Sequence, residues 1–308
     1  MKGVIFMNIS IVILTKNSSR TIKQCLRSCL SSNYAPLEII IIDGGSIDNT
    51  LKLIKETLGN FPYKILYDEG KGLGYARDIG WRTSNGKYIL MLDSDVLLPN
   101  NFIKEAVKIM ENDNKVGSLG TKLKPICKER SWLSIFQEKN LAIHLHWKED
   151  VYPNEAIATH TACTLFRREA LEKINGFDHY FRLAKEDSDI SFRLRKAGYK
   201  LAYLNVYASH LETSQRFWKI NFKYGRSYVH IAKKHPKEAT LLNRKNIFLT
   251  IALFLPPLQI LTYLNYLYKY WKLNDLTLSE KIILPFIETI RQALRTIGMI
   301  YELVLSLF

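Results

Sequence analysis

The chain has 308 residues, enough to bury a sizeable hydrophobic core in one large domain or two small ones. Hydrophobic residues make up 47% and charged residues 24%, a composition that excludes an intrinsically disordered chain. The formal net charge of +15 indicates an anionic partner, which could be nucleic acid, an acidic membrane surface or a phosphorylated substrate.

The four cysteines, Cys25, Cys29, Cys127 and Cys163, lack the spacing of a metal site or of a disulfide framework. Cys25 and Cys29 lie four residues apart and share one face of a predicted helix, where we expect them in the core. The cysteine content favours a reducing compartment.

Strand and helix alternate through the first 95 residues. The apolar runs are typical of strands buried on both faces. The predicted strands cover residues 8–14, 37–42, 63–67 and 87–92, and the predicted helices cover 21–30, the segment that ends near 58 and the segment around 75–81. This order predicts a parallel sheet with right-handed crossovers.

The fourth strand delivers two carboxylates, Asp93 and Asp95, to its C-terminal end. In open α/β sheets, ligands bind outside the carboxyl ends of the strands. Two aspartates at that place can share a divalent cation and a diphosphate, because Mg²⁺ and Mn²⁺ accept carboxylate oxygens together with substrate phosphates. The plainer alternative is a capped turn before Pro99, in which an aspartate bonds to the backbone.

Strand and helix signals continue to about residue 210. We expect a helix over 101–111 and strands over 115–124 and 159–167. A helix over 168–174, ended by Gly176, then leads to a helix from Glu186 to Ala197. The last predicted strand covers 200–207, with His210 just beyond it. Residues 125–158 have weak periodicity, and their aromatic side chains form either a lid over a substrate or part of a core.

Six segments together resemble the family 2 glycosyltransferases: Ser10–Asn17, Asp43–Thr50, Gly70–Gly80, Asp93–Asp95, Gly176–Asp178 and Glu186–Asp187. Each motif is weak alone, but their order and spacing are specific, and the resemblance covers roughly residues 8–230. It implies a GT-A fold, an α/β architecture with a Rossmann-like, mostly parallel sheet flanked by helices. It also implies an inverting hexosyltransferase with a nucleotide-sugar donor and a divalent cation, Mn²⁺ or Mg²⁺.

The resemblance implies roles for the residues at the strand ends. Thr15 and Asp43 match contacts to the nucleoside, with Asn17 beside them in the nucleotide-sugar site. Arg77 matches a donor-site residue near the base and phosphates. The second carboxylate of the family's Asp-Asp-x-Ser pattern is Gly44 here, so UDP-, GDP- and dTDP-sugars all stay open as donors.

Metal and base residues are implied in the same way. Asp95 would bind the cation directly, Asp93 would approach the ribose or the cation, and His210 matches an additional ligand of some members. Asp187 resembles the general base that takes the acceptor proton, a step that an inverting transfer requires. Its alternative role is to cap the helix that follows, where acids are favoured in any case.

Two other classes of protein remain as alternatives. A sugar-1-phosphate nucleotidyltransferase would need a glycine-rich loop after the first strand, where Thr15-Lys16-Asn17 stands instead. A non-catalytic basic module would explain the charge. However, the basic segment over residues 214–245 adjoins the uncharged segment 247–268 and lacks a sheet pattern of base-stacking aromatics. This favours a membrane surface over nucleic acid as the partner.

The composition changes after residue 213, which we take as the end of a GT-A domain over 8–213. Residues 214–245 form a predicted basic connector, and 246–308 form hydrophobic and amphipathic helices. Residues 247–268 carry no charge over 22 positions, and the final helix begins near Ser279. We expect membrane association with the catalytic domain on the cytoplasmic side and a lipid-linked or glycan acceptor. A soluble helical domain is the alternative.

Overall fold

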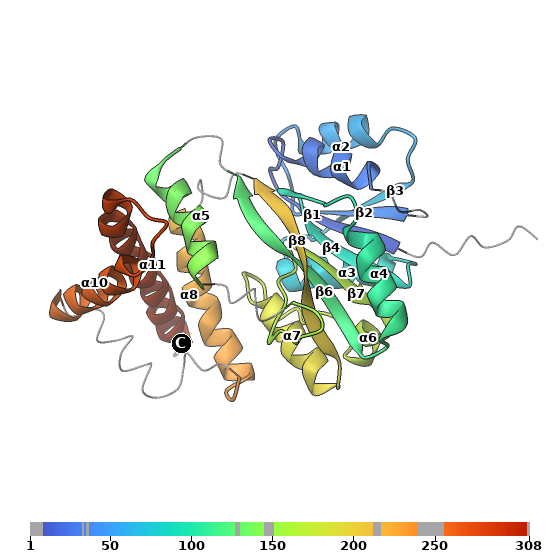
Figure 1. The fold of residues 1–308 in the computed structure, drawn as a ribbon. Coiled ribbons are helices and arrows are strands. Elements are labelled where there is room, and N and C mark those ends of the chain that lie inside the picture. Colours follow the sequence, from blue (N-terminus) through green and yellow to red (C-terminus); the bar gives the residue numbers. More distant parts are fainter. Residues whose placement is uncertain are drawn as a thin grey trace, which may run out of the picture. The chain divides into compact units, whose positions relative to one another are not determined.

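The computed structural model of the chain describes residues 9–32, 34, 37–126, 130–144, 151–211, 217–238 and 256–306. The chain divides into two compact units (Figure 1). Unit 1 comprises Met1–Ile126, His144–Arg182 and Glu186–Glu212, and unit 2 comprises Cys127–Ile143, Leu183–Lys185 and Thr213–Phe308.

Unit 1 is built on an eight-stranded sheet with the order β3-β2-β1-β4-β7-β6-β8-β5. Its strands are β1 (Ile9–Thr15), β2 (Leu37–Asp43), β3 (Tyr63–Tyr67), β4 (Tyr88–Asp93), β5 (Val96–Leu97), β6 (Val116–Ile126), β7 (Cys163–Arg167) and β8 (Lys200–Leu211). Its helices are α1 (Ile22–Leu30), α2 (Thr50–Leu58), α3 (Leu73–Thr83), α4 (Phe102–Asn112), α6 (Arg168–Lys173) and α7 (Glu186–Lys196).

The sheet is mixed, and the prediction of a mostly parallel sheet is corrected in its second half. β1, β2, β3 and β4 run parallel to one another, and β6 is parallel to β8. However, β7 runs antiparallel to both β4 and β6, and β5 runs antiparallel to β8. Apolar periodicity identifies a strand but not its direction, so the expected parallel order held only where strand and helix alternate.

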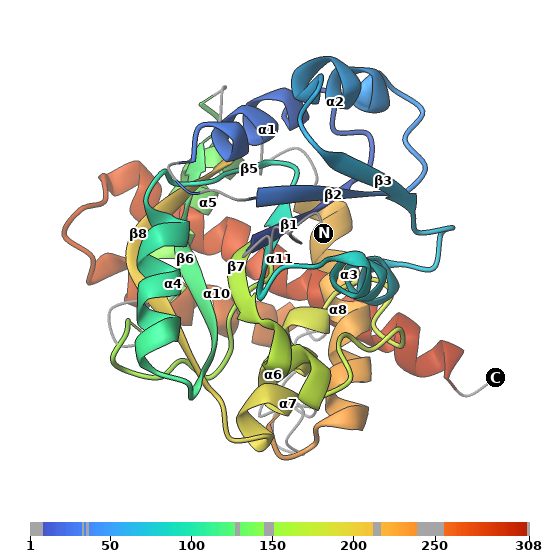
Figure 2. The same cartoon turned by 90° about the vertical axis from the view of Figure 1, so that its right-hand side faces the viewer.

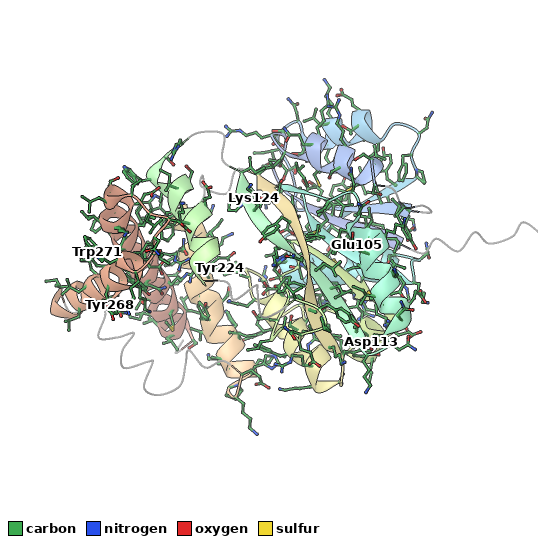
Figure 3. All side chains as sticks on the ribbon, in the orientation of Figure 1. Glu105, Asp113, Lys124, Tyr224, Tyr268 and Trp271 are labelled. Carbon is green, nitrogen blue, oxygen red and sulfur yellow. The ribbon has the colours of Figure 1, made fainter. Side chains whose placement is uncertain are left out.

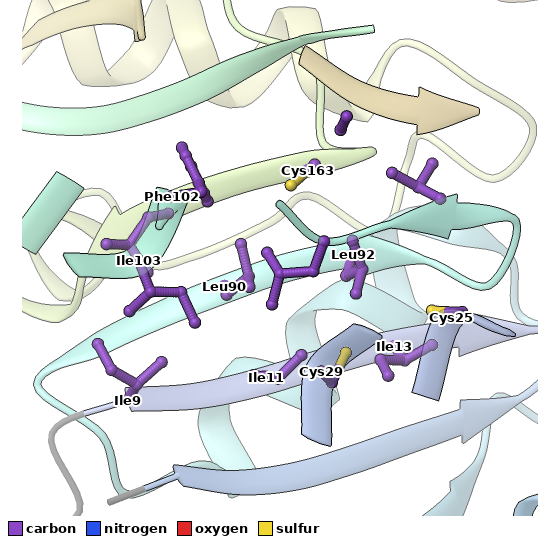
Figure 4. Close-up of a cluster of buried hydrophobic side chains, with 14 of the residues drawn as sticks. Ile9, Ile11, Ile13, Cys25, Cys29, Leu90, Leu92, Phe102, Ile103 and Cys163 are labelled. Atoms are coloured by element: carbon purple, nitrogen blue, oxygen red, sulfur yellow. The ribbon is translucent and has the colours of Figure 1, made fainter. Parts of the chain in front are cut away.

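Successive side chains of β1 point to opposite faces of the sheet, and helices bury them on both faces. Ile9, Ile11 and Ile13 pack in one core with residues of α1, α2 and α4 (Figure 4). Val12 belongs to a second core with residues of α3, α6 and α7. Figure 2 shows α1 and α2 on one side of β1–β3 and α3 on the other. Both predicted helix cysteines, Cys25 and Cys29, lie buried in the first core.

Two strand boundaries differ from the predictions by four residues, and the others differ by two residues at most. β7 begins at Cys163 rather than at Thr159. β8 continues beyond Tyr207 to Leu211, because it keeps pairing with β6 and then with β5. His210 therefore lies within a strand and not beyond its end. Strand β5 is absent from the sequence predictions because two residues carry no periodicity.

Unit 2 is helical. It contains α5 (Trp132–His144), α8 (Phe217–Lys234), α10 (Pro256–Trp271) and α11 (Leu278–Leu305). Phe136 of α5 packs in a core with Phe217, Tyr270 and Leu284, which supports the core interpretation of part of the 125–158 segment. Gly225 and Gly298 let α8 and α11 approach closely, since a Cβ at either position would overlap the backbone of the other helix.

The C-terminal predictions fall partly outside the described residues. Residues 239–255 hold Arg244, Lys245 and the first part of the uncharged segment 247–268, and they are not described. Helix α10 begins at the Pro256-Pro257 pair, in agreement with the preference of proline for the first helical turn. Among the described residues, no helix combines the length and apolar character that crossing a bilayer requires.

Candidate active site

The ends of β1, β2 and β4 bring the sequence-predicted residues to one edge of the sheet. Thr15 is paired with Asp43, and Leu14 is paired with Asp93, in parallel register. Carboxyl ends of parallel strands share one edge, so Thr15, Asp43 and Asp93 are neighbours there. This edge is where doubly wound sheets bind ligands.

Hydrogen bonds join the loops that follow these strands. Ser18 Oγ lies 2.8 Å from Ser94 Oγ, which connects the β1 loop to the β4 loop. The Asn17 backbone N–H donates to Ser46 Oγ at 2.9 Å, and Asn17 Oδ1 accepts from the Ile47 N–H at 2.9 Å. Asn17 has a positive φ of 49°, a conformation that asparagine tolerates better than most residues. Its side chain is therefore used to hold the two loops together.

Two aspartates shape the loop after β2. Asp43 accepts hydrogen bonds from the Gly45 N–H, from the Ser46 N–H and, at 2.6 Å, from Ser46 Oγ. Asp48 accepts bonds from Thr50 and from the Ser19 N–H. Desolvation raises the pKa of Asp48, but these hydrogen bonds outweigh it and lower the pKa to about 2. The hydrogen bonds accepted by these two carboxylates thus fix the shape of the loop.

Arg77 lies beneath this edge on α3, with its side chain only 4% exposed. Its Nη2 donates to Asp93 Oδ1 at 3.0 Å, and its Nε donates to Glu186 Oε1 at 3.1 Å. Desolvation lowers the pKa of Arg77, but the Asp93 and Glu186 carboxylates outweigh this and raise it. The guanidinium is therefore a permanent buried charge that joins α3, β4 and α7.

Two buried polar atoms at this edge lack a partner among the described residues: Thr15 Oγ1 and Arg77 Nη1. A buried polar group without a hydrogen bond costs about 1–3 kcal/mol. Such groups are rare in folded proteins and call for a physical explanation. A ligand that supplies hydrogen-bonding atoms would explain both.

Asp95 and His210 lie together although they are far apart in the chain. The antiparallel pairing of β5 with β8 sets Val96 opposite His210, and His210 Nε2 lies 3.4 Å from Asp95 Oδ1. Burial lowers the pKa of His210, but the Asp95 and Asp93 carboxylates outweigh it and raise the pKa. Within the described ranges, no group of three or more His, Cys, Asp or Glu side chains has the arrangement of a metal site.

Asp187 lies in the first turn of α7, and the side chain is half-buried. Its Oδ1 accepts from the Ser188 N–H at 2.6 Å and from Ser188 Oγ at 3.2 Å. Oδ2 has no hydrogen bond to any residue in the described part of the chain. Ser188 thus holds one carboxylate oxygen of Asp187 in place and leaves the other without a hydrogen bond among the described residues.

Glu186, next to Asp187, was not given a role by the sequence. It is buried, and it accepts a hydrogen bond from Arg77. Burial is the main cause that raises the pKa of Glu186, and the neighbouring Asp187 raises it further, whereas Arg77 lowers it. The signal was present in the Glu186-Asp187 motif, but a carboxylate at a helix start reads as an exposed cap. Only the fold shows that Glu186 points inward.

His160, which the sequence offers only as a candidate acceptor-side residue, is a second residue whose surroundings the fold alone shows. Its Nε2 lies 2.9 Å from the Thr121 carbonyl oxygen, which can only accept, so Nε2 carries the hydrogen. Its Nδ1 is buried and has no partner within the described ranges. Burial, which outweighs the pull of Asp187 and Asp93, lowers the pKa of His160. The ring is therefore neutral at pH 7 and presents an unused acceptor.

The glycine motif before α3 serves packing with a loop. The Leu73 and Gly74 N–H groups donate to the carbonyl oxygens of Arg182 and Phe181 at 3.0 and 2.9 Å. A Cβ on Gly74 would overlap the Asp178 carbonyl oxygen. Because loop carbonyls satisfy these first N–H groups of α3, the loop that leads to Glu186 is fixed against the helix that carries Arg77.

Comparison with known families agrees with this geometry. The family model described as Glycosyl transferase family 2 matches residues 10–175. An Escherichia coli chondroitin synthase is 27% identical over 194 residues, which cover 62% of this chain and 27% of that protein. A poly-β-1,6-N-acetyl-D-glucosamine synthase of Staphylococcus epidermidis is 28% identical over 198 residues, which cover 63% and 47% of the two chains. The chain thus spans less than half the length of these two relatives.

Solved structures share the fold. A mannosyltransferase from Pyrobaculum calidifontis, in complex with GDP-Man and Mn²⁺, superposes with a TM-score of 0.66 at 17% identity and covers 96% of this chain and 87% of its own. Staphylococcus aureus TarS in complex with UDP-GlcNAc superposes with a TM-score of 0.57 at 17% identity and covers 93% and 82%. At these identities the likeness establishes the GT-A fold alone.

Proposed function

The chain belongs to glycosyl transferase family 2, and we propose that it transfers a sugar from a nucleotide-diphosphate-sugar donor to an acceptor hydroxyl or phosphate. The transfer inverts the anomeric carbon. The neighbours named above hold GDP-Man and UDP-GlcNAc, so a guanine and a uracil donor are the first to test. The acceptor is a lipid-linked sugar or a glycan.

The unpartnered buried atoms carry this proposal. Thr15 Oγ1 lies at the end of β1, where the nucleoside of the donor would lie, and Arg77 Nη1 provides a positive donor for its phosphates. Charge-assisted hydrogen bonds from arginine to phosphate are among the stronger ones in proteins. A donor that reaches these two atoms would supply the hydrogen bonds that the buried groups lack.

The donor set at the β4 and β8 ends fits a divalent cation. Asp95 and His210 supply a carboxylate oxygen and an imidazole nitrogen, and their side chains are 42% and 25% exposed. Two protein ligands suit a cation that completes its coordination with phosphate oxygens and water. Asp93 is nearby but shares its charge with Arg77. A bound Mn²⁺ or Mg²⁺ would offset the charge that develops on the leaving diphosphate.

Asp187 is the proposed general base. The Ser188 bonds orient its carboxylate through Oδ1, and Oδ2 can take the proton of the acceptor hydroxyl as that oxygen attacks the anomeric carbon. Glu186 acts indirectly, because it holds Arg77 in place from the residue next to the base. His160 Nδ1, a neutral acceptor, would receive a hydrogen bond from a sugar hydroxyl.

A ligand panel tests the proposal. We expect one of the UDP-, GDP- or dTDP-sugars, with Mn²⁺ or Mg²⁺, to raise the melting temperature and to be hydrolysed slowly. Thr15→Val removes one hydroxyl at constant shape and should weaken that donor by about 2- to 12-fold. Ser32→Ala is the matched control, since Ser32 Oγ is also buried and without a partner in the described part, but it precedes β2 at the other edge. If no donor raises the melting temperature and none is hydrolysed, the proposal is refuted.

A further inference from the structure

Helix α10 presents an apolar and aromatic face to solvent. Five of its side chains are between 49% and 62% exposed: Ile260, Leu261, Leu264, Tyr268 and Trp271. At 3.6 residues per turn, these positions fall within about one third of the helix circumference. Figure 3 labels Tyr268 and Trp271 among the side chains of this helix. Scattered exposed apolar residues are normal, but a continuous face of this kind marks an interaction site.

Helix α11 extends the same surface. Leu278, Ile282 and Phe286 recur every fourth residue, which places them on one side of α11, and each is exposed. Two contacts join this side to α10: Tyr263 Oη lies 3.4 Å from the Ile282 carbonyl oxygen, and Lys281 Nζ lies 5.6 Å from the Trp271 ring centroid. We call the exposed side chains of both helices, residues 260, 261, 264, 268, 271, 278, 282 and 286, the hairpin face.

The charged side chains beside the hairpin face are mostly lysines, whereas the acids of α11 are buried or paired. Lys269 and Lys272 lie at its end, and Lys272 Nζ is 4.1 Å from the Tyr268 ring centroid. The three glutamates of α11 are occupied within unit 2: Glu280 caps the helix from a buried position, Glu288 is buried against Arg291, and Glu302 pairs with Arg226. Asp275 is the one exposed acid between residues 256 and 306. The outer surface is therefore apolar with a cationic rim.

We propose that the hairpin face docks on an anionic lipid bilayer, with α10 and α11 in the plane of the headgroups. Tyrosine and tryptophan are enriched at that level of a membrane, and lysine side chains near an anionic leaflet gain electrostatic attraction. Amphipathic helices with these two features bind in the interface without spanning it. A second copy of the chain is disfavoured as the occupant, because it would bring a cationic rim against a cationic rim. The inference does not depend on the proposed transfer reaction.

Vesicle binding by the full chain tests the inference. We expect co-sedimentation with phosphatidylcholine vesicles that contain about a third phosphatidylglycerol, weaker binding to phosphatidylcholine alone, and partial release by salt. Removal of three cations in Lys269→Gln/Lys272→Gln/Lys281→Gln should weaken binding about 100-fold, at roughly fivefold for each lysine. Lys52→Gln/Lys55→Gln/Lys104→Gln removes the same charge from exposed positions of α2 and α4 and should change binding little.

Fluorescence locates the contact. Phospholipids with brominated acyl chains should quench tryptophan emission, and Trp271→Leu should lose most of that quenching while it still binds. Trp218→Leu is the matched control, since Trp218 is equally exposed on α8. Equal binding by both triple variants, quenching lost in Trp218→Leu instead, or a dimer in light scattering that Leu264→Gln/Trp271→Gln dissociates would each overturn the inference.

Discussion

Arg77 Nη2 donates to Asp93 Oδ1 at 3.0 Å, so a buried guanidinium neutralises part of the charge at the end of β4. Arg77 also reaches Glu186, which precedes the proposed base by one position. One side chain thus connects the donor side of the site to the base side. Because Asp93 shares its charge with Arg77, we propose Asp95, two residues on, as the main carboxylate ligand of a cation.

Loss of Arg77 should destabilise the fold. Arg77→Met leaves Glu186 as a buried carboxylate without its cation, and removal of one partner from a buried pair costs about 3–5 kcal/mol of unfolding free energy. Urea unfolding at pH 7 measures the change. Lys52→Met is the control, since its pair with Glu56 is exposed and should contribute at most about 1 kcal/mol. Equal effects of the two substitutions would contradict the buried pair.

Cation dependence should follow Asp95. Asp95→Asn keeps the size of the side chain but removes the charge that holds Mn²⁺ or Mg²⁺, so the cation should no longer strengthen donor binding. Melting temperatures with donor, in Mn²⁺ and in excess EDTA, give the readout. Asp275→Asn, an exposed aspartate of unit 2, should respond as the natural chain does. Undiminished cation dependence in Asp95→Asn would exclude Asp95 as a ligand.

Gly74 should not tolerate a side chain. Gly74→Ala places a Cβ on the Asp178 carbonyl oxygen, which is backbone and cannot turn away. We expect a fall of several degrees in melting temperature and weaker donor binding, because the loop before Glu186 shifts against α3. For the melting temperature, Gly44→Ala is the control, since its Cβ would first meet the flexible side chain of Lys16, at 3.2 Å from Cδ. A stable Gly74→Ala variant would show that the loop adapts.

Much of the first half of the fold follows from the sequence because the signals there are local. The bounds of β3 are those predicted, and the helices around it end within a few residues of the expected positions. The direction of β7 and the existence of β5 could not be predicted, since both depend on pairing with strands that are distant in the chain.

The same limit applies to the site. The strand-end residues Thr15, Asp43 and Asp93 could be placed together, since parallel strands share an edge. Arg77 and Glu186 are 109 positions apart, and no sequence pattern around either residue predicts that they pair. The unpartnered atoms of Thr15, Arg77 and His160 likewise become visible only when burial is known.

The stability of the protein should depend on pH through His160. Burial lowers the pKa of His160 from its usual value, so as pH falls below about 6.5 the unfolded chain binds a proton before the folded chain does. Folding is therefore destabilised with falling pH until the folded pKa is reached. His160→Gln removes the group that binds this proton in the unfolded chain. The melting temperature of the variant should therefore fall less steeply than that of the natural chain between about pH 7 and pH 5. Parallel curves would show that His160 titrates normally.

Asp187→Asn separates catalysis from structure. Asparagine keeps the shape and can still accept the Ser188 hydrogen bond through its amide oxygen, so the fold and donor binding should survive. It cannot take the acceptor proton, and general-base catalysis contributes about 10²- to 10⁴-fold in rate. Turnover should fall by that factor while the donor-induced melting shift stays unchanged. Ser188→Ala is the matched neighbour, since it removes only the 3.2 Å hydroxyl contact and leaves the backbone N–H bond in place. A small loss of turnover in Asp187→Asn, or a loss that is explained by unfolding of the variant, would show that Asp187 is not the general base.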